Sequence, residues 1–163
     1  MKTLITGATG FVGAAVLREL LKKKHKAKAL VRKSSVLDNL KNLDVEIVYG
    51  DLKDRDSLKR CLKDCKYLFH VAADYRLWVP KPKEIYENNV TGTENLMEEA
   101  LNSGIKKIIY TSSVAVLGKP IEGDIADEKT PVNADQMIGH YKKSKFLAEE
   151  KVKELYKTKK LPV

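Results

Sequence analysis

The sequence is poor in cysteine and has no long apolar run, and both shortages exclude classes of protein. Its two cysteines, Cys61 and Cys65, form one C-x3-C pair without a second pair. A structural zinc site needs four ligands, so we expect no metal centre and interpret both as small core or surface residues in a reducing cytoplasm. No stretch reaches the roughly 18 apolar residues of a membrane span, and no signal-peptide pattern is seen, so we expect a cytoplasmic protein.

Acidic residues are also in the minority, with 22 Asp and Glu against 31 Lys and Arg, which gives a formal charge of +9. A basic surface is one sign of nucleic-acid binding. Here, however, the lysines are spread over expected helix faces and ends and are not interleaved with exposed aromatic residues. We therefore expect no specific nucleic-acid partner. A positive field also favours an anionic cofactor.

The chain does contain a regular alternation of Val- and Ile-rich runs with segments of helical periodicity. The expected strands are Lys2–Thr6, Ala27–Val31, Val45–Tyr49, Tyr67–Val71 and Ile105–Thr111, with the start of a sixth at Leu161–Val163. The expected helices are Phe11–Lys23, Asp54–Lys63, Ile85–Ser103 and Tyr141–Lys157, with a short helix or turn at Ser35–Asn42 and a polar loop at Gly118–Met137.

This alternation predicts right-handed crossovers and a parallel sheet that is covered on both faces. A length of 163 residues fits a single domain. The fold class is therefore α/β, a doubly wound parallel sheet of the Rossmann type in three layers, with strand order 3-2-1-4-5 over residues 1–163.

A glycine-rich turn, with spacing G-x-x-G-x-x-G, joins the first strand to the first helix. Gly7 allows the sharp turn, Gly10 lets the backbone approach a pyrophosphate, and Gly13 lets the helix pack close to the strand. The helix N-terminus then offers N–H groups and its positive dipole end to the anion. The residues predicted to hold a dinucleotide here are Gly7, Thr9, Gly10, Phe11, Val12 and Gly13. A glycine turn without a ligand is the alternative.

The second strand is followed by Arg32, where NAD-binding domains normally carry an acidic residue for the ribose hydroxyl. An arginine with a serine nearby can pair with a 2′-phosphate. The position thus favours NADP as the cofactor and leaves NAD open. Arg32 as a solvated loop residue is the alternative.

Tyr141 and Lys145 stand four residues apart at the start of the last expected helix, so they share one face. A phenol is a poor base at neutral pH, and a neighbouring ammonium favours its charged form. Tyr141 is therefore a candidate for proton exchange with a substrate alcohol or carbonyl while hydride moves at a nicotinamide. The alternative is that the two residues are an ordinary exposed pair, four positions apart on a helix surface.

A serine follows the fifth strand, at the carboxyl edge where open α/β sheets bind ligands. The hydroxyl of Ser113, or of its neighbour Ser112, can hydrogen-bond a substrate oxygen and stabilise developing charge. A strand-end cap is the alternative for either serine.

Six motifs, in this order, resemble the extended short-chain dehydrogenase/reductase family, the NAD-dependent epimerase/dehydratase type. They are the glycine turn, Gly50-Asp51-Leu52, Val71-Ala72-Ala73, Asn89-Val90-Thr91-Gly92-Thr93, Thr111-Ser112-Ser113 and Tyr141-Lys142-Lys143-Ser144-Lys145. Two shorter stretches, Ala73–Trp78 and Ile138–Tyr141, are similar to the hopanoid-associated sugar epimerase and dihydroflavonol-4-reductase-like branch.

The resemblance implies roles for several residues beyond the turn. It assigns Asp51 and Leu52 to the adenine, with an N-cap as the alternative for Asp51. It makes Ala72 and Ala73 the small residues along which the cofactor passes. Asn89 would help to order the active site, or be an ordinary exposed polar residue.

Within the same resemblance, the catalytic serine is Ser113 rather than Ser112, and Lys145 also bonds the nicotinamide ribose. Arg76, Trp78 and His140 either line the substrate pocket or pack within loops. The implied activity is that of an NAD(P)-dependent oxidoreductase or sugar-nucleotide epimerase acting on a small molecule, a nucleotide sugar or another carbonyl compound. A non-catalytic dinucleotide-binding regulatory module is the competing class.

Members of this family continue into a smaller C-terminal substrate domain. We therefore expect this chain to lack the substrate lobe, to bind cofactor weakly by itself and to turn over poorly. In many relatives the two long helices form a dimer interface, so a homodimer is a further expectation. The apolar residues that would fit either that interface or the core are Leu96, Leu101, Phe146 and Leu147.

Overall fold

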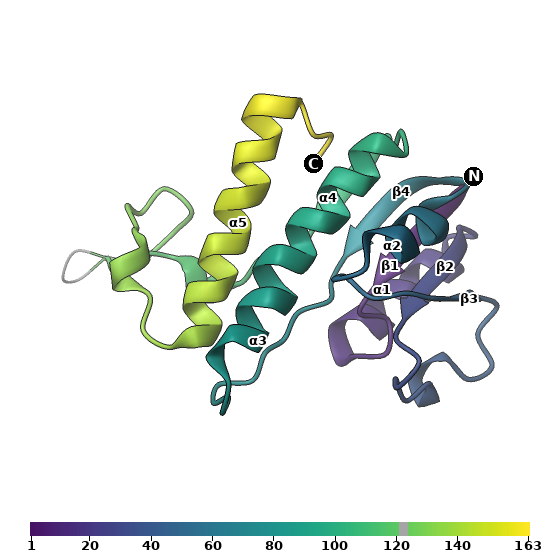
Figure 1. Ribbon diagram of the computed structural model, residues 1–163, viewed down its shortest axis with the longest axis horizontal. Coiled ribbons are helices and arrows are strands. Elements are labelled where there is room, and N and C mark those ends of the chain that lie inside the picture. The colour runs from purple at the N-terminus through teal and green to yellow at the C-terminus, as the bar shows by residue number, and fades with distance from the viewer. Residues whose placement is uncertain (121–123) are drawn as a thin grey trace.

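The computed structural model describes residues 1–120 and 124–163. Five parallel strands form one sheet in the order β3-β2-β1-β4-β5, which confirms the predicted doubly wound arrangement (Figure 1). The strands are β1 Lys2–Thr6, β2 Lys26–Val31, β3 Glu46–Tyr49, β4 Cys65–His70 and β5 Lys107–Tyr110. The α-helices are α1 Phe11–Lys22, α2 Arg55–Leu62, α3 Pro82–Tyr86, α4 Gly92–Asn102 and α5 His140–Lys159.

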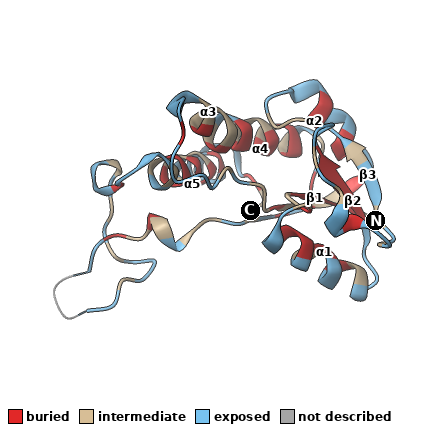
Figure 2. Ribbon diagram, turned by 90° about the horizontal axis from the view of Figure 1, so that it is seen from below, coloured by how far each residue is buried: buried red, intermediate tan, exposed pale blue. Residues whose placement is uncertain are grey.

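The helices lie on both faces of the sheet, as three layers require (Figure 2). Successive side chains of a strand point to opposite faces. Leu4 and Leu68 therefore pack into the core beneath α2, α4 and α5, whereas Ile5 and Ala29 pack against Leu17 of α1. Both sets are at most 1% exposed, so the sheet is the centre of two apolar cores.

The long helix expected at Ile85–Ser103 is present, but it contains a π-helical turn. It begins at Pro82, where a proline costs no intrahelical hydrogen bond. A π-helical turn, η2 Glu87–Thr91, then separates α3 from α4. Such turns shift the facing of side chains locally and are frequent at functional sites. Apolar periodicity alone did not show this insertion.

Two smaller predictions need correction or refinement. Leu161–Val163 form no strand, although Ile108 N donates a 2.7 Å hydrogen bond to the Pro162 carbonyl and Leu161 is buried. Pro162 has no N–H to continue a ladder, and Lys160 turns the chain with φ 55°. The short element expected at Ser35–Asn42 is a 3₁₀ turn, η1 Asp38–Leu40.

The polar loop expected after β5 is largely irregular where it is described. It contains one 3₁₀ turn, η4 Ala134–Gln136, which Asn133 caps through its side chain. A further 3₁₀ turn, η3 Val114–Val116, precedes it. Residues 121–123, which belong to the predicted loop, lie outside the described residues.

Cys61 and Cys65 are both 2% exposed, which decides for the core interpretation. Burial raises the pKa of both thiols, so they remain protonated and unreactive at neutral pH. Within residues 1–120 and 124–163, none of the helices has the length and apolar character that crossing a bilayer requires.

Candidate functional site

The glycine turn lies between β1 and α1, and close backbone approach explains its glycines. Gly7 has φ +76°, and a Cβ there would lie 2.7 Å from the amide nitrogen of Ala72. A Cβ on Gly13 would lie 2.1 Å from the Gly7 carbonyl oxygen. Both distances are too short for any side chain, so the turn is built to hold α1 directly against it.

The N-terminus of α1 is open at this turn. Gly10 is its N-cap, and no side chain of the described residues caps it. Phe11 and Val12, the first two residues of the helix, are 92% and 54% exposed. Uncapped N–H groups at a helix N-terminus favour an anion, so a dinucleotide pyrophosphate fits this cradle.

Arg32 stands at the same edge of the sheet as the glycine turn. It follows β2, which pairs with β1 up to Thr6 and Leu30. Its side chain is exposed, and its backbone N–H donates to Ser35 Oγ at 3.2 Å. The predicted arginine and serine are therefore neighbours at this edge of the sheet.

Asp51 follows β3 and shapes its own turn. Its Oδ1 accepts from Lys53 N at 2.9 Å, and its backbone N–H donates to Ser57 Oγ at 3.0 Å. The N-cap of α2 is Asp54, which accepts from Ser57 N at 3.1 Å, so the N-cap alternative for Asp51 is wrong. The neighbouring Leu52 lies against α4, with its Cβ 2.8 Å from where a Cβ on Gly92 would stand.

A buried chain of hydrogen bonds ties the end of β4 to the end of β1. His70 Nδ1 lies 2.7 Å from Thr6 Oγ1, and His70 Nε2 lies 2.9 Å from Thr93 Oγ1. Ala72, which is half-buried, donates from its backbone to Thr6 Oγ1 at 3.2 Å, and Ala73 beyond it is exposed. These hydrogen bonds thus fix Ala72, which faces Gly7, to the ends of β1 and β4.

Burial, aided by the charge of Lys145, lowers the pKa of His70 to about 3. The ring is therefore neutral at physiological pH and serves as a hydrogen-bond bridge. Sequence reasoning missed this residue, whose signal was a single histidine at the end of an apolar strand.

Asn89 is buried rather than an ordinary exposed polar residue, with 3% of its surface accessible. It lies in the π-helical turn, and its Nδ2 donates to the Asp74 carbonyl at 2.8 Å and to Ser144 Oγ at 2.9 Å. Its Oδ1 accepts from Asp74 N at 2.7 Å. Because Ser144 lies between Tyr141 and Lys145, Asn89 connects the segment after β4 to the helix that carries the predicted pair.

The three predicted pocket residues lie on exposed loops and ends. Arg76 pairs with Asp74, with the two charged atoms 2.6 Å apart, and this pairing lowers the pKa of the Asp74 carboxyl. His140 Nδ1 lies 3.2 Å from the Tyr86 hydroxyl. Trp78 is 78% exposed, so neither it nor Arg76 is held by core packing.

Ser113 and Tyr141 come together at the carboxyl edge of the sheet. The Tyr141 hydroxyl donates to Ser113 Oγ at 3.4 Å. Ser113 Oγ also accepts from Ala115 N at 3.2 Å and so caps the η3 turn. The Ser113 side chain therefore acts as a cap and also contacts Tyr141.

Lys145 is 3% exposed, which excludes the surface-pair alternative. Its ammonium donates to the Tyr110 hydroxyl at 3.2 Å and to the Thr111 carbonyl at 3.0 Å. Burial lowers the pKa of Lys145 to about 8, against the raising effect of Glu149. It shares the inward face of α5 with Tyr141, as predicted, while its hydrogen bonds go to the end of β5.

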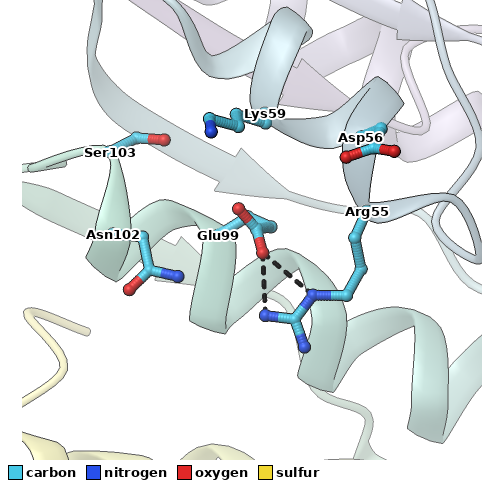
Figure 3. Close-up of a pocket in the computed structure, with 6 residues that line it drawn as sticks. All are labelled: Arg55, Asp56, Lys59, Glu99, Asn102 and Ser103. Atoms are coloured by element: carbon cyan, nitrogen blue, oxygen red, sulfur yellow. Dashed lines mark hydrogen bonds and ion pairs between the residues drawn. The ribbon is translucent and has the colours of Figure 1, made fainter.

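A hollow of about 490 Å³ lies elsewhere, between α2 and α4 (Figure 3). It is lined by Arg55, Asp56, Lys59, Glu99, Asn102 and Ser103. Arg55 Nη2 lies 2.7 Å from Glu99 Oε1, an ion pair that joins the two helices. None of the predicted cofactor or catalytic residues lines it. The candidate site is defined instead by the glycine turn and the ends of the strands.

The strand order, the glycine turn and the open helix end together define a Rossmann-type dinucleotide-binding domain. Comparison with known proteins narrows this class. The chain belongs to the NAD dependent epimerase/dehydratase family, whose model matches residues 3–163. The family assignment made from the sequence motifs is confirmed.

The chain is similar to a putative dihydroflavonol 4-reductase from Synechocystis sp., with 46% identity over 90% of this chain and 42% of that protein. Among solved structures, that of gox2253 has 54% identity and a TM-score of 0.94, over 98% of this chain and 48% of that one. The UDP-glucose 4-epimerase of Thermus thermophilus, in complex with NAD, has 25% identity and a TM-score of 0.86 over 99% and 52%. The chain thus spans about half the length of these relatives.

Proposed function

We propose that this chain is the dinucleotide-binding and proton-transferring part of an NAD(P)-dependent oxidoreductase or sugar-nucleotide epimerase that acts at a carbonyl or alcohol carbon. The observation that carries the proposal is the hydrogen bond from the Tyr141 hydroxyl to Ser113 Oγ. The pair lies at the carboxyl edge of the sheet, the same edge that carries the glycine turn.

The bound nicotinamide would supply or accept the hydride. The side chains of this chain hold the substrate oxygen and move its proton. Ser113 hydrogen-bonds that oxygen, and Tyr141 gives it a proton in reduction or takes one in oxidation. The buried ammonium of Lys145 lies on the same helix face and donates to the Tyr110 hydroxyl and the Thr111 carbonyl, so it supplies positive charge at the end of β5.

The cofactor residues support NADP over NAD in this proposal. Arg32 is exposed beside Ser35 at the end of β2, where a positive charge can meet a 2′-phosphate. Gly7, Thr9, Gly10, Phe11, Val12 and Gly13 would hold the pyrophosphate, with Asp51 and Leu52 at the adenine and Ala72, Ala73 and Asn89 along the path to the nicotinamide. A competition titration of NADP against NAD tests the preference.

Exposed apolar side chains favour reduction of a carbonyl compound with an apolar body over epimerisation of a nucleotide sugar. Tyr75, Leu77 and Trp78 are each at least 78% exposed on the loop that Asn89 anchors through Asp74. Exposed apolar clusters of this kind mark binding surfaces. Two similar proteins carry the names "Putative dihydroflavonol 4-reductase" and "Sterol demethylase protein B". A parallel screen of apolar ketones and of nucleotide sugars with the full-length protein tests this choice.

The decisive experiment is Tyr141→Phe in the full-length protein. If Tyr141 moves the proton, turnover collapses while the dissociation constant of the cofactor stays within a factor of about two of the parent. A non-catalytic dinucleotide-binding module would instead show cofactor binding without turnover in either form. Retained turnover in Tyr141→Phe would contradict the proposal.

Self-association through the two long helices is a further part of the proposal. The helices α4 and α5 lie side by side (Figure 1). Leu96 and Phe146 belong to the cores, at 0% and 9% exposure, so they are not available to a partner. Leu101 and Leu147 are half-buried and remain the apolar candidates for an interface. Sedimentation of the full-length protein with and without Leu147→Glu tests it.

A further inference from the structure

Three side chains of α5, spaced four residues apart, hold the segment that follows β5. They are Tyr141, Lys145 and Glu149, which share one face because four residues make about one helical turn. Their partners are Ser113 for Tyr141, Thr111 for Lys145 and Ser112 for Glu149. Each residue of Thr111–Ser113 is therefore fixed from the helix, and Glu149 is the one anchor that the proposed function leaves without a role.

Glu149 is ionised and well supplied with donors. Its Oε2 accepts from Ser112 Oγ, and its Oε1 lies 2.7 Å from Lys153 Nζ. The side chain is 22% exposed. Burial raises the pKa of Glu149, but the hydrogen bonds from Lys153 and Ser112 and the charge of Lys145 outweigh it, so the pKa lies below its ordinary value.

The carboxylate also acts on Lys145 across one helical turn. The titratable groups that act on Lys145 or contact it are Tyr110 from β5, His70 from β4 and Glu149 from its own helix, which also carries Tyr141. His70 is neutral, and burial raises the pKa of Tyr110, which keeps that phenol neutral too. Among these groups, Glu149 is the carboxylate that opposes the loss of the Lys145 proton.

We propose that Glu149 is a positioning residue of this site. Its hydrogen bond fixes Ser112, and with it the direction in which Ser113 meets Tyr141, while its negative charge holds the Lys145 ammonium. It does not touch the reacting atoms. This inference rests on the proposed function, because it gives Glu149 a part in a reaction that Ser113, Tyr141 and Lys145 carry out.

Two variants of the full-length enzyme with bound cofactor separate the two effects. Glu149→Gln keeps an acceptor oxygen for Ser112 but removes the charge. Because the active form needs a protonated Lys145, loss of that charge should move the high-pH limb of the kcat profile to lower pH. Ser112→Ala keeps the charge but frees the chain before Ser113. It should lower kcat by about tenfold or more with the pH profile in place, since small misplacements of a catalytic group are costly.

The matched control is Glu150→Gln. Glu150 is exposed, pairs with the same Lys153 at 3.1 Å and carries the same charge one residue further along. It should leave kcat and its pH profile unchanged. Glu149→Asp, which restores the charge, should return the high-pH limb toward that of the parent. The binding constant of the cofactor should stay unchanged in all four variants.

An unshifted limb in Glu149→Gln, equal to that of Glu150→Gln, would overturn the inference. If Glu149→Gln fails to fold, Ser112→Ala alone decides. Either an unchanged kcat or a shifted high-pH limb in Ser112→Ala would then overturn the inference. Tyr141→Phe and Ser113→Ala are measured beside these variants. If both remain active, the proposed function fails, whereas if both are inactive and Glu149→Gln is normal, only the positioning role fails.

Discussion

The hydroxyl of Tyr141 donates to Ser113 Oγ across 3.4 Å, although 28 residues separate the two in the sequence. The serine comes from the carboxyl end of β5, and the tyrosine from the first turn of α5. In a parallel α/β arrangement, the helix that follows a strand begins at the edge of the sheet where that strand ends. This contact brings the two hydroxyl groups to one place.

Ser113→Ala should therefore lower kcat in the full-length protein by about 100-fold, the usual effect of removing one donor to developing charge. The binding of cofactor should be unchanged, because Ser113 follows β5, whereas the glycine turn follows β1. Single-turnover kinetics with saturating cofactor measure the loss. A larger loss in Ser112→Ala than in Ser113→Ala would reverse the assignment of the two serines.

The sequence predicted the sheet because strands buried on both faces read as near-continuous apolar runs. Leu4 and Ile5 are adjacent, face opposite sides and are both fully buried. The strand order followed from the alternation of strands with helices and from the place of the glycine turn. The predicted sixth strand does not form. In the described part of the chain, Pro162 accepts a single hydrogen bond from β5.

The candidate site could be predicted from the sequence only in part, for a physical reason. Tyr141 and Lys145 follow from helical spacing, but the burial of Asn89 depends on a π-helical turn, which periodicity does not encode. Likewise, the bond from His70 to Thr6 joins residues 64 positions apart, and sequence gives no distance for such a pair. Glu149 could have been predicted from the sequence, since it continues the four-residue spacing of Tyr141 and Lys145.

Gly13→Ala should disrupt both the fold and cofactor binding. The added Cβ would lie 2.1 Å from the Gly7 carbonyl oxygen, a backbone atom that cannot move without moving the turn. We expect a loss of about 1–3 kcal/mol in the free energy of unfolding, as for overpacking elsewhere, together with loss of NADP binding. Denaturant unfolding and a fluorescence titration measure the two. Ala15→Ser, on the exposed side of α1, is the control and should change neither.

Arg32→Ala should weaken NADP and spare NAD. A charge-assisted hydrogen bond to the 2′-phosphate is worth about 1.5–3 kcal/mol, so the dissociation constant for NADP should rise by about tenfold or more. NAD, which has no such phosphate, should bind as in the parent. The neighbouring exposed Lys33→Ala is the control for general loss of positive charge. Equal weakening of both cofactors in Arg32→Ala would show that this residue does not select between them.

His70 should make the protein less stable in mild acid. Its pKa is about 3 in the folded state, against 6.5 in the unfolded chain. Between these values the unfolded state binds the additional proton, so the free energy of unfolding falls as pH drops from about 6.5 towards 3. The slope approaches about 1.4 kcal/mol per pH unit.

Denaturant midpoints at pH 7 and 5 measure this effect in the parent and in His70→Gln. The variant should lose part of the stability at pH 7 and much of the difference between the two pH values. His25→Gln, at an exposed histidine, is the control and should keep the parent slope. An unchanged slope in His70→Gln would mean that other groups cause the acid sensitivity.

Lys145→Met should stabilise the folded chain while it abolishes turnover. Burial lowers the pKa of Lys145 from 10.5 to about 8, so below pH 8 the native state holds a charge that the interior disfavours. Met fills similar space without that charge, although it leaves the Tyr110 hydroxyl and the Thr111 carbonyl without this donor. The net gain should be about 1–2 kcal/mol at pH 7.

The pH dependence of this gain identifies its origin. As pH rises from about 8 to 10.5, the native lysine loses its proton before the unfolded one does, so the parent becomes more stable and the gain shrinks. Unfolding curves at pH 7 and 10 measure it, with the exposed Lys142→Met as the matched control. If Lys145→Met were instead destabilising at both pH values, the two hydrogen bonds would outweigh the buried charge, and this lysine would be retained for stability as well as for chemistry.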